Sequence, residues 1–372
     1  MTPAKPSLEL LRSLTDEHVL RALMAEPRLT RAELALRTGI SKPTVSESVR
    51  RLSEAGLVRD TGERTTGRGR VGTYYALAER GCALVVGIAP EGVVAEALDV
   101  HGDVRAREVV GVRRPARPDD VTAALTAAVR AVAGAAPPVR LATVSAADPV
   151  DRATGRLVHL PDAPFLLGEL APAQALAPFV AGPVAVDNDV NWAARAERTE
   201  AGDGDLEDFA YLHLGEGLGC AIVADGEVRR GATGLAGEIA HLVTRGPGGR
   251  AMAFTEVFAE LELRREASTA VDVPAVLRAF SSDPDAPAAA VAGLVAALVA
   301  LADPAVVVLG GDWGSRPEVV EAVRLCVDRL PRPVPIRAAR VTQEPSLRGA
   351  RGRALVDLRA AVVAELTPRP RP

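Results

Sequence analysis

Residues 29–58 read LTRAELALRTGISKPTVSESVRRLSEAGLV, which predicts two short helices joined by a tight turn. Thr30 and Glu33 have the spacing of a capping box, in which each residue satisfies a free backbone N–H of the other. Leu34 and Leu36 are expected to give the first helix its apolar contacts. Gly39 should end that helix, because glycine readily adopts the left-handed conformation found after a last turn.

The second helix of this stretch is expected to carry a polar, cationic outer face. Ser41 can cap it, and Pro43 suits its first turn, where a missing N–H costs little. The apolar stripe runs through Val45, Val49, Leu52 and Leu57. A helix that lies in the major groove presents side chains of the type left facing outward. We therefore predict that DNA is contacted by Ser41, Lys42, Thr44, Ser46, Glu47, Arg50 and Arg51.

A wing is predicted directly after the second helix. Val58 starts one strand, residues 73–77 (TYYAL) form its return, and a Gly- and Arg-rich loop lies between them. Arg64, Arg68 and Arg70 in this segment would reach phosphate or the minor groove. The plainer alternative is a small helical domain with a solvated basic loop. The order of caps, turn glycine, exposed cations and wing favours a winged helix-turn-helix over residues 1–80.

Composition describes a globular, cytoplasmic protein. The chain has 372 residues, of which 48% are hydrophobic and 25% charged, as in ordinary globular domains. Three distant cysteines fit a reducing compartment and argue against a disulfide framework. The sequence contains no uninterrupted apolar run long enough to cross a bilayer, so no membrane partner is expected. Residues 1–80 hold 14 basic and 10 acidic residues, whereas the whole chain has a net charge of −4. A mildly basic head on an acidic body suits a nucleic-acid reader joined to a sensor.

After a short hinge at about residues 78–81, the pattern becomes that of an α/β protein. Three short strands are followed by a helix and a strand, and a similar plan begins again near residue 183. A duplicated plan predicts two similar lobes with a cleft between them. The expected strands are 83–88, 92–100, 104–112, 139–144, 183–186, 208–214, 219–224, 227–230, 304–309 and 336–341. The expected helices are 16–25, 121–135, 190–199, 253–267, 286–302, 317–329 and 353–366.

Five segments resemble the ROK (repressor, open reading frame, kinase) family, in its winged-helix regulator branch. They are SKPTVSESVRRLSEAGLVRDTG from 41, PVDRATGRLVHLPD from 149, VAVDNDVNWAARAE from 184, YLHLGEGLGCAIVADGEVRRGATGLAGEIAHL from 211 and VVVLGGDWG from 306. The resemblance implies a two-lobed actin-like, sugar-kinase (ribonuclease-H-like) ATPase fold after the winged helix. The first lobe would hold residues 81–186 and 353–367, and the second residues 187–352. Family members phosphorylate sugars or sense them and regulate genes.

The resemblance also implies a sugar site. Asn188 matches a sugar-hydroxyl ligand and Asp189 the general base that would take a hydroxyl proton. Glu238 and His241 match a Glu-x-Gly-His motif, with Ala240 in place of the glycine, and Glu256 matches a further sugar-binding glutamate. Asp189 could instead cap the helix expected from Val190, and His241 could be an ordinary core histidine.

Departures from the family pattern argue against phosphoryl transfer. Where kinases carry an Asp-x-Gly-Gly-Thr phosphate loop, residues 87–92 read GIAPEG. Gly215-Glu216-Gly217 replaces a Gly-Thr-Gly loop, which puts a carboxylate where anionic oxygens would bind. Residues 246–256 contain no cysteine, although the family has a zinc loop there. We therefore expect a vestigial base at Asp189, no catalytic residue, no cofactor and no metal.

These features predict a sugar-responsive transcriptional regulator, a repressor that binds a double-stranded DNA operator. The effector would be a sugar or a sugar phosphate. A homodimer or higher homo-oligomer is expected, because one winged helix reads only a half-site. Two alternatives remain open: an ATP-dependent sugar kinase that retains a DNA-binding head, and a regulator that responds to no ligand.

Overall fold

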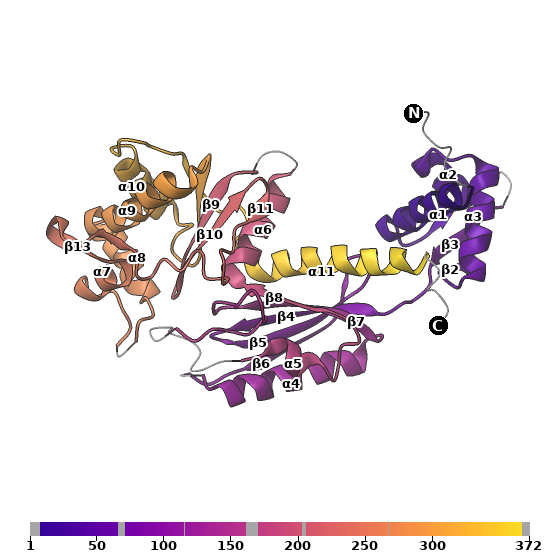
Figure 1. Ribbon diagram of the computed structural model, residues 1–372, viewed down its shortest axis with the longest axis horizontal. Coiled ribbons are helices and arrows are strands. Elements are labelled where there is room, and N and C mark those ends of the chain that lie inside the picture. The colour runs from indigo at the N-terminus through magenta and orange to yellow at the C-terminus, as the bar shows by residue number, and fades with distance from the viewer. Residues whose placement is uncertain are drawn as a thin grey trace.

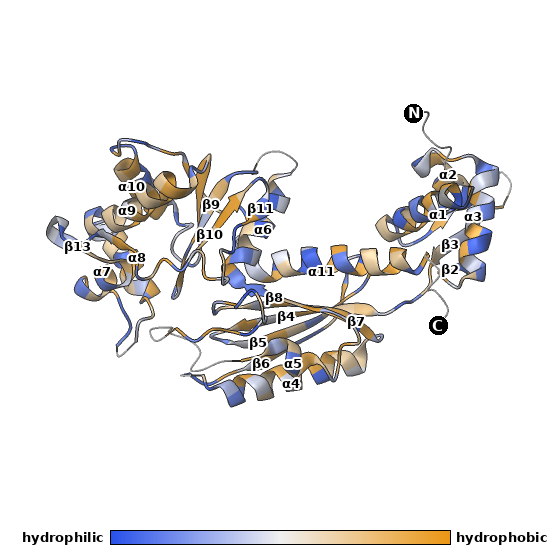
Figure 2. Ribbon diagram, viewed as in Figure 1, coloured by the Kyte–Doolittle hydropathy of each residue, from blue (hydrophilic) through white to orange (hydrophobic). Residues whose placement is uncertain are grey.

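The computed structural model describes residues 8–65, 71–114, 116–160, 170–202, 206–266 and 268–366. A small head and two α/β lobes follow one another along the chain, and one long helix, α11, runs from between the lobes to the head (Figure 1). Hydrophobic strands lie inside each lobe beneath helices that are more polar outside (Figure 2).

The head is a winged helix-turn-helix, as predicted. Its elements are α1 (Leu8–Ala25), β1 (Leu29–Thr30), α2 (Arg31–Thr38), α3 (Lys42–Glu54), β2 (Val58–Arg64) and β3 (Thr73–Leu77), with strand order β1-β3-β2. The capping box of Thr30 and Glu33 is present, and Gly39 has a φ of 68° at the end of α2. The prediction for Leu36 is wrong, because this side chain is 84% exposed and only Leu34 of the pair is buried.

The first lobe (lobe I) is built on a five-stranded sheet with the order β6-β5-β4-β7-β8. Its strands are β4 (Cys82–Ala89), β5 (Gly92–Leu98), β6 (Val104–Gly111), β7 (Val139–Ala146) and β8 (Val184–Asn188). Side chains alternate across β4: Leu84 and Val86 pack with α4 (Pro118–Ala135), and Ala83 and Val85 face α11 (Pro345–Val363). The short helix α5 (Pro172–Leu176) belongs to the α4 side.

The second lobe (lobe II) repeats this plan with the strand order β11-β10-β9-β14-β15. One face packs with α6 (Asp189–Ala201), and the other covers the larger core that includes α9 and α10. Its strands are β9 (Phe209–Leu214), β10 (Leu218–Ala224), β11 (Glu227–Val228), β14 (Val306–Gly310) and β15 (Ile336–Ala338). The remaining elements are β12 (Val243–Arg245), η1 (Pro247–Gly249), β13 (Ala251–Ala253), α7 (Phe254–Glu260), α8 (Val273–Ser282), α9 (Asp285–Ala302), α10 (Pro317–Val327) and η2 (Ala364–Leu366).

Several expected bounds differ from those of the structure. α1 begins at Leu8 instead of residue 16, and α7 ends at Glu260 instead of residue 267. β8 continues to Asn188 within the sheet of lobe I, beyond the expected lobe boundary at 186. α11 begins at Pro345 and packs on lobe I from its first turn, through Leu347, so the expected boundary at 353 cuts this helix.

α6 and α11 lie against each other between the two sheets. They approach so closely that a Cβ at Gly349 would lie 1.9 Å from the carbonyl oxygen of Trp192. Only glycine fits such a crossing, so this contact fixes how the two lobes meet.

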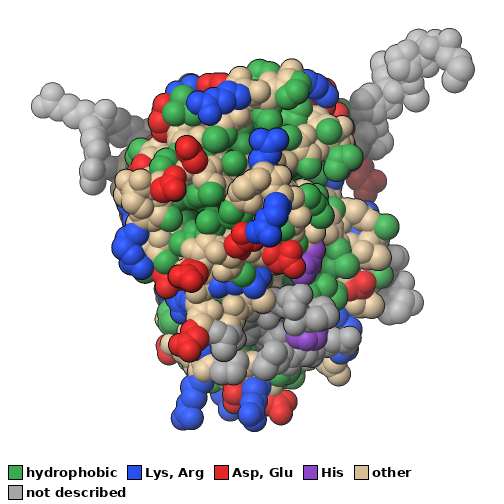
Figure 3. All heavy atoms as spheres, turned by 90° about the vertical axis from the view of Figure 1, so that its left-hand side faces the viewer, with side chains coloured by type: hydrophobic (Ala, Val, Ile, Leu, Met, Phe, Trp, Pro, Cys, Tyr) green, Lys and Arg blue, Asp and Glu red, His purple; other side chains and the backbone are tan. Residues whose placement is uncertain are grey.

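α9 has the length and composition of a membrane span. Its side chains Val291, Leu294 and Val295 are fully buried in the core of lobe II. A buried core helix passes the same test of length and hydropathy, so this helix carries no argument for a membrane. Hydrophobic side chains also spread over the outer end of lobe II, among scattered charges (Figure 3); exposed ones in this lobe include Val243, Leu301 and Leu325.

Candidate DNA-binding head and ligand cleft

The outer face of α3 is polar and exposed, as the sequence predicts. Ser41, Lys42, Thr44 and Glu47 are exposed, and Ser46 is half-buried. Ser41 caps the helix: its hydroxyl accepts a hydrogen bond from the backbone N–H of Thr44 at 3.4 Å. A contact between this face and DNA stays a prediction.

Arg50 and Arg51 have different surroundings although they are neighbours. Arg50 is exposed and pairs with Glu47 and Glu54, each at 2.6 Å, on the outer side of α3. Arg51 donates to the buried carboxylate of Asp16 in α1 at 2.6 and 3.2 Å, and the Ser48 hydroxyl donates to the same group at 2.5 Å. The expectation that Arg51 points outward like Arg50 is therefore wrong, and a contact between Arg51 and DNA stays a prediction. The partner of Arg51 holds it inward, and it ties α3 to α1.

The predicted wing exists as the hairpin β2–β3. Arg64 lies at the end of β2, where it pairs with Asp60 at 3.1 Å. The predicted contacts Arg68 and Arg70 lie outside the described residues.

A cavity of about 420 Å³ lies between the two lobes. The turn β4–β5, the end of β8 and the start of α11 contribute from one side, and α6, the turn β9–β10 and residues 237–241 contribute from the other. Among the described residues of its lining there are six carboxylates and neither lysine nor arginine. The six are Glu91, Asp148, Asp189, Glu216, Glu238 and Asp312.

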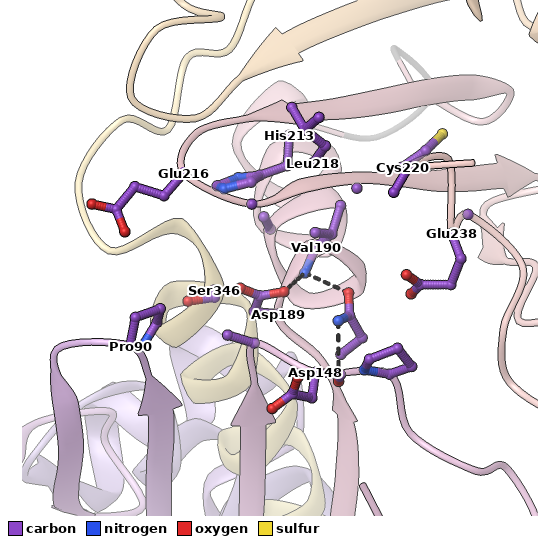
Figure 4. A pocket seen from close by; sticks show the side chains of 18 of the residues that line it. Pro90, Asp148, Asp189, Val190, His213, Glu216, Leu218, Cys220, Glu238 and Ser346 are labelled. Atoms are coloured by element: carbon purple, nitrogen blue, oxygen red, sulfur yellow. Dashed lines mark hydrogen bonds between the residues drawn. The ribbon is translucent and has the colours of Figure 1, made fainter. Parts of the chain in front are cut away.

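Asn188 and Asp189 line this cleft at the junction of β8 and α6, which is called its floor below. Figure 4 shows Asp189 there, beside Val190. Asn188 caps α6: its Oδ1 accepts from the Val190 N–H at 2.9 Å, and its Nδ2 donates to the Asp148 carbonyl at 3.2 Å. Asp189 also accepts from the Val190 N–H, at 2.8 Å. Both residues therefore serve the helix start as well as lining the cleft, and the amide of Asn188 is largely used.

Burial makes the floor carboxylates hard to ionise. Burial, together with the charge of Asp189, raises the pKa of Asp148 to about 7. Burial also raises the pKa of Asp189, although the nearby His213 opposes this shift. Burial between the cleft walls, and then the negative charges of Asp189 and Asp148, raise the pKa of Glu238 to about 7. The residue nevertheless keeps part of its surface exposed to water within the cleft. A ligand that donates hydrogen bonds here would relieve this repulsion.

Glu238 and His241 both line the cleft, although their segment is a turn and not the helical turn considered from their spacing. Gly237 has a φ of 100° and lies against β10, where a Cβ would be 1.8 Å from the Cys220 carbonyl oxygen. The expected ligand Glu256 is exposed and does not line the cleft. Its carboxylate accepts from the Ala253 N–H at 3.2 Å, at the start of α7.

The mouth of the cleft differs from its floor because its carboxylates have arginine partners. Arg114, which follows β6, donates to Glu216 at 2.6 Å and to Glu91 at 2.9 Å. Arg265 of lobe II donates to the other oxygen of Glu216. The expectation that the Glu216 charge acts as a bare repulsive group is therefore incomplete: it is neutralised by two guanidinium groups. Among the described residues, no group of three His, Cys, Asp or Glu side chains could hold a metal ion.

Comparisons with known proteins agree with this architecture. A model of winged helix-turn-helix DNA-binding domains matches residues 12–59, and the ROK family model matches residues 97–255. A crystal structure of a ROK family transcriptional regulator, a homologue of the E. coli MLC protein, superposes with a TM-score of 0.63 at 18% identity, covering 95% of this chain and 99% of that one. The chain thus carries a ROK domain behind a winged helix-turn-helix head.

Other relatives are similar over parts of this chain. A proposed xylose repressor of Caldicellulosiruptor sp. is 24% identical over 63% of this chain and 59% of its own length. A glucokinase of Halalkalibacterium halodurans is 46% identical over 18% of this chain and 20% of its own. A ROK glucokinase structure from Streptomyces griseus has a TM-score of 0.55 at 21% identity, covering 73% of this chain and 98% of that one. The match thus spans less than two thirds of these curated relatives.

The sequence analysis did not predict that Asp148 and His213 line the cleft. Asp148 follows β7 and lies at the floor, and His213 projects from β9 between Asp189 and the turn at Gly215. A signal for Asp148 existed, because it lies two residues after the end of a buried strand and precedes Pro149. His213 had only the alternation of a strand to suggest it.

Proposed function

We propose that this protein is a DNA-binding transcriptional regulator whose ROK domain senses a sugar and whose head represses genes at an operator. A homodimer would read the two half-sites, and the protein would act in the cytoplasm. The observation that carries the proposal is the course of α11, which links the cleft to the head.

The first residues of α11 line the cleft. Pro345 and Ser346 line it, and Figure 4 shows Ser346 beside Asp189. Glu344, directly before them, pairs with Arg351 of the same helix at 2.8 Å. A ligand that changes the distance between the lobes would therefore act on this end of the helix.

The last residues of α11 lie in the head. Val362 is part of the head's hydrophobic core, packed with residues such as Leu20 and Val58. Arg359 donates from Nη2 to the Met24 carbonyl in α1 and from Nε to the Val100 carbonyl in lobe I, both at 3.0 Å. Coupling between two sites requires an element that both sites bias. α11 is such an element, because one rigid helix touches the cleft, lobe I and the head.

The direct test is binding of the full chain to its own upstream DNA, measured by fluorescence anisotropy and titrated with sugars and sugar phosphates. We expect one sugar to release the DNA, and this release must reflect different affinity for the two states. Arg359→Ala should bind both DNA and sugar but lose most of the release. Arg353→Ala is the matched control, because Arg353 pairs at 2.7 Å with Asp357 within α11. DNA binding that no sugar changes would favour the ligand-independent alternative.

A sugar kinase is the second candidate, and one observation favours it: Asp189 is held at the floor of the cleft, where a general base would stand. The test is ADP release across a panel of sugars. Turnover by the natural protein that is lost in Asp189→Asn would establish that the protein is a sugar kinase. It would also contradict the proposal that the cleft is catalytically inactive. We expect no turnover above that of the variant.

A further inference from the structure

The cleft mouth contains a carboxylate that is bound as if it were a ligand. Glu216 lies in the turn between β9 and β10, and each of its oxygens accepts from a different arginine: Oε2 from Arg114 at 2.6 Å and Oε1 from Arg265. Its side chain is only 17% exposed. Figure 4 shows it at the opposite end of the cleft from Glu238.

The two arginines come from different parts of the fold. Arg114 belongs to lobe I, and besides Glu216 it holds the turn β4–β5 through Glu91 and the Pro90 carbonyl at 3.3 Å. Arg265 belongs to lobe II and follows α7. The pair Arg114–Glu216 is therefore a direct bridge between the lobes across the mouth.

The turn that carries Glu216 is firmly held. The Val271 N–H donates to the Glu216 carbonyl at 2.9 Å, and the Trp313 indole donates to the Gly215 carbonyl at 3.0 Å. Trp313 itself is fully buried in the core of lobe II. A preorganised backbone means that the carboxylate is presented to the arginines at little entropic cost.

We propose that Glu216 is a built-in anionic ligand that determines which class of effector the cleft accepts. It occupies two arginines at the mouth that could otherwise bind a phosphate group, and it joins the lobes without a bound anion. Planar guanidinium groups pair equally well with carboxylate and phosphate oxygens, so a phosphate-bearing ligand would have to displace Glu216 from two charged partners. The cleft therefore selects uncharged, hydroxyl-rich ligands and excludes sugar phosphates and nucleotides. This selection rests on the proposed sensor function, whereas the bridge itself does not.

The first test removes the tethered carboxylate. Glu216→Ala removes the carboxylate to which the guanidinium groups of Arg114 and Arg265 both donate. The affinity of the variant for inorganic phosphate and for pyrophosphate is then measured by calorimetry. We expect the variant to bind pyrophosphate at least about tenfold more tightly than the natural protein, since a desolvated charged partner is replaced. The double variant Glu216→Ala, Arg265→Ala should lose this gain. If the natural protein binds as tightly as Glu216→Ala, or if Glu216→Ala gains nothing, the proposal is wrong.

The second test measures the bridge without sugar or DNA, so that its failure can be told from failure of the proposed function. Spin labels are placed at the exposed residues Arg130 of α4 and Glu318 of α10 after exchange to cysteine, with Cys326→Ser as background. Arg114→Ala should raise the open population about fivefold, the effect of one partly shielded ion pair. Arg113→Ala, the loss of an exposed neighbouring arginine, should leave the distances unchanged. Equal distance distributions in the two variants would show that the Arg114–Glu216 pair does not hold the lobes together.

Discussion

The floor and the mouth of the cleft both contain carboxylates, but only those at the mouth are paired with arginine. At the floor, Asp148 and Asp189 lie together without a lysine or arginine among the described lining residues, and their pKa values are raised. At the mouth, Glu91 and Glu216 are each bound by Arg114. The protein neutralises its own charge at the mouth and leaves the floor to be satisfied by a ligand. A cleft can thus be closed at one end and receptive at the other.

The same contrast between a paired and an unpaired buried carboxylate can be created in the head by removing the arginine that pairs with Asp16. Asp16 is buried, like Asp148, but it is held by Arg51 and Ser48. Arg51→Ala should lower the stability of the head by about 2–3 kcal/mol, because it leaves a buried carboxylate without its cation. Hydrogen exchange of α1 and α3 in the full chain is the measurement. Arg50→Ala should change it by less than about 0.5 kcal/mol, and equal losses in the two variants would contradict the contrast.

At the floor, removing a carboxylate should stabilise the protein, with a dependence on pH. An unfolded aspartate ionises near its ordinary pKa of 3.8, whereas Asp148 in the folded protein keeps its proton up to about pH 7. The charged form is thus disfavoured by folding, and stability falls as the pH rises through this window. Asp148→Asn has no charge to bury. It should gain about 2 kcal/mol at pH 8, below the limit of about 4 that the full shift would give.

Tryptophan fluorescence in urea can measure this gain, because Trp192 and Trp313 both lie in the lobes. At about pH 3, below both the ordinary pKa of 3.8 and the raised pKa of the folded protein, the aspartate is mostly protonated in both states, so the variant and the natural protein should be nearly equally stable. A gain of the same size at both pH values would show that packing, and not charge, is responsible.

Ligand binding should depend on the floor and not on every glutamate that the family pattern suggests. At pH 8, above its raised pKa of about 7, Glu238 is ionised, and Glu238→Gln should weaken sugar binding about tenfold because it removes a charged acceptor for the sugar hydroxyls. Glu256→Gln should leave the affinity unchanged, because Glu256 lies outside the cleft lining. Calorimetry with the sugar that releases DNA tests both. A loss in Glu256→Gln matching that in Glu238→Gln would mean that the cleft rearranges on binding.

Local patterns in the sequence predict the fold well, but they do not predict interactions between residues that lie far apart in the sequence. The capping box of Thr30 and Glu33 depends on three residues of spacing, and it is confirmed. The surroundings of Arg51 could not be predicted, because its partner Asp16 lies 35 residues earlier on another helix. The same holds for Glu216, whose partners lie 102 and 49 residues away. From the sequence alone, the Glu216 carboxylate is predicted to repel an anionic ligand. Only the fold shows that two arginines neutralise its charge.

The smallest effect is expected where the charges are already paired. Arg114→Ala should lower the stability of the lobes by about 0.5–1 kcal/mol at low salt, because Arg114 is 39% exposed and solvent screens its pairs. In 1 M NaCl, where the screening length is about 3 Å, the difference from the natural protein should vanish. Urea unfolding followed by tryptophan fluorescence at both salt concentrations measures it, with Arg113→Ala as control. A loss that persists in high salt would mean that Arg114 contributes by packing, and the mouth would then resemble the floor in depending on burial instead of on charge pairing.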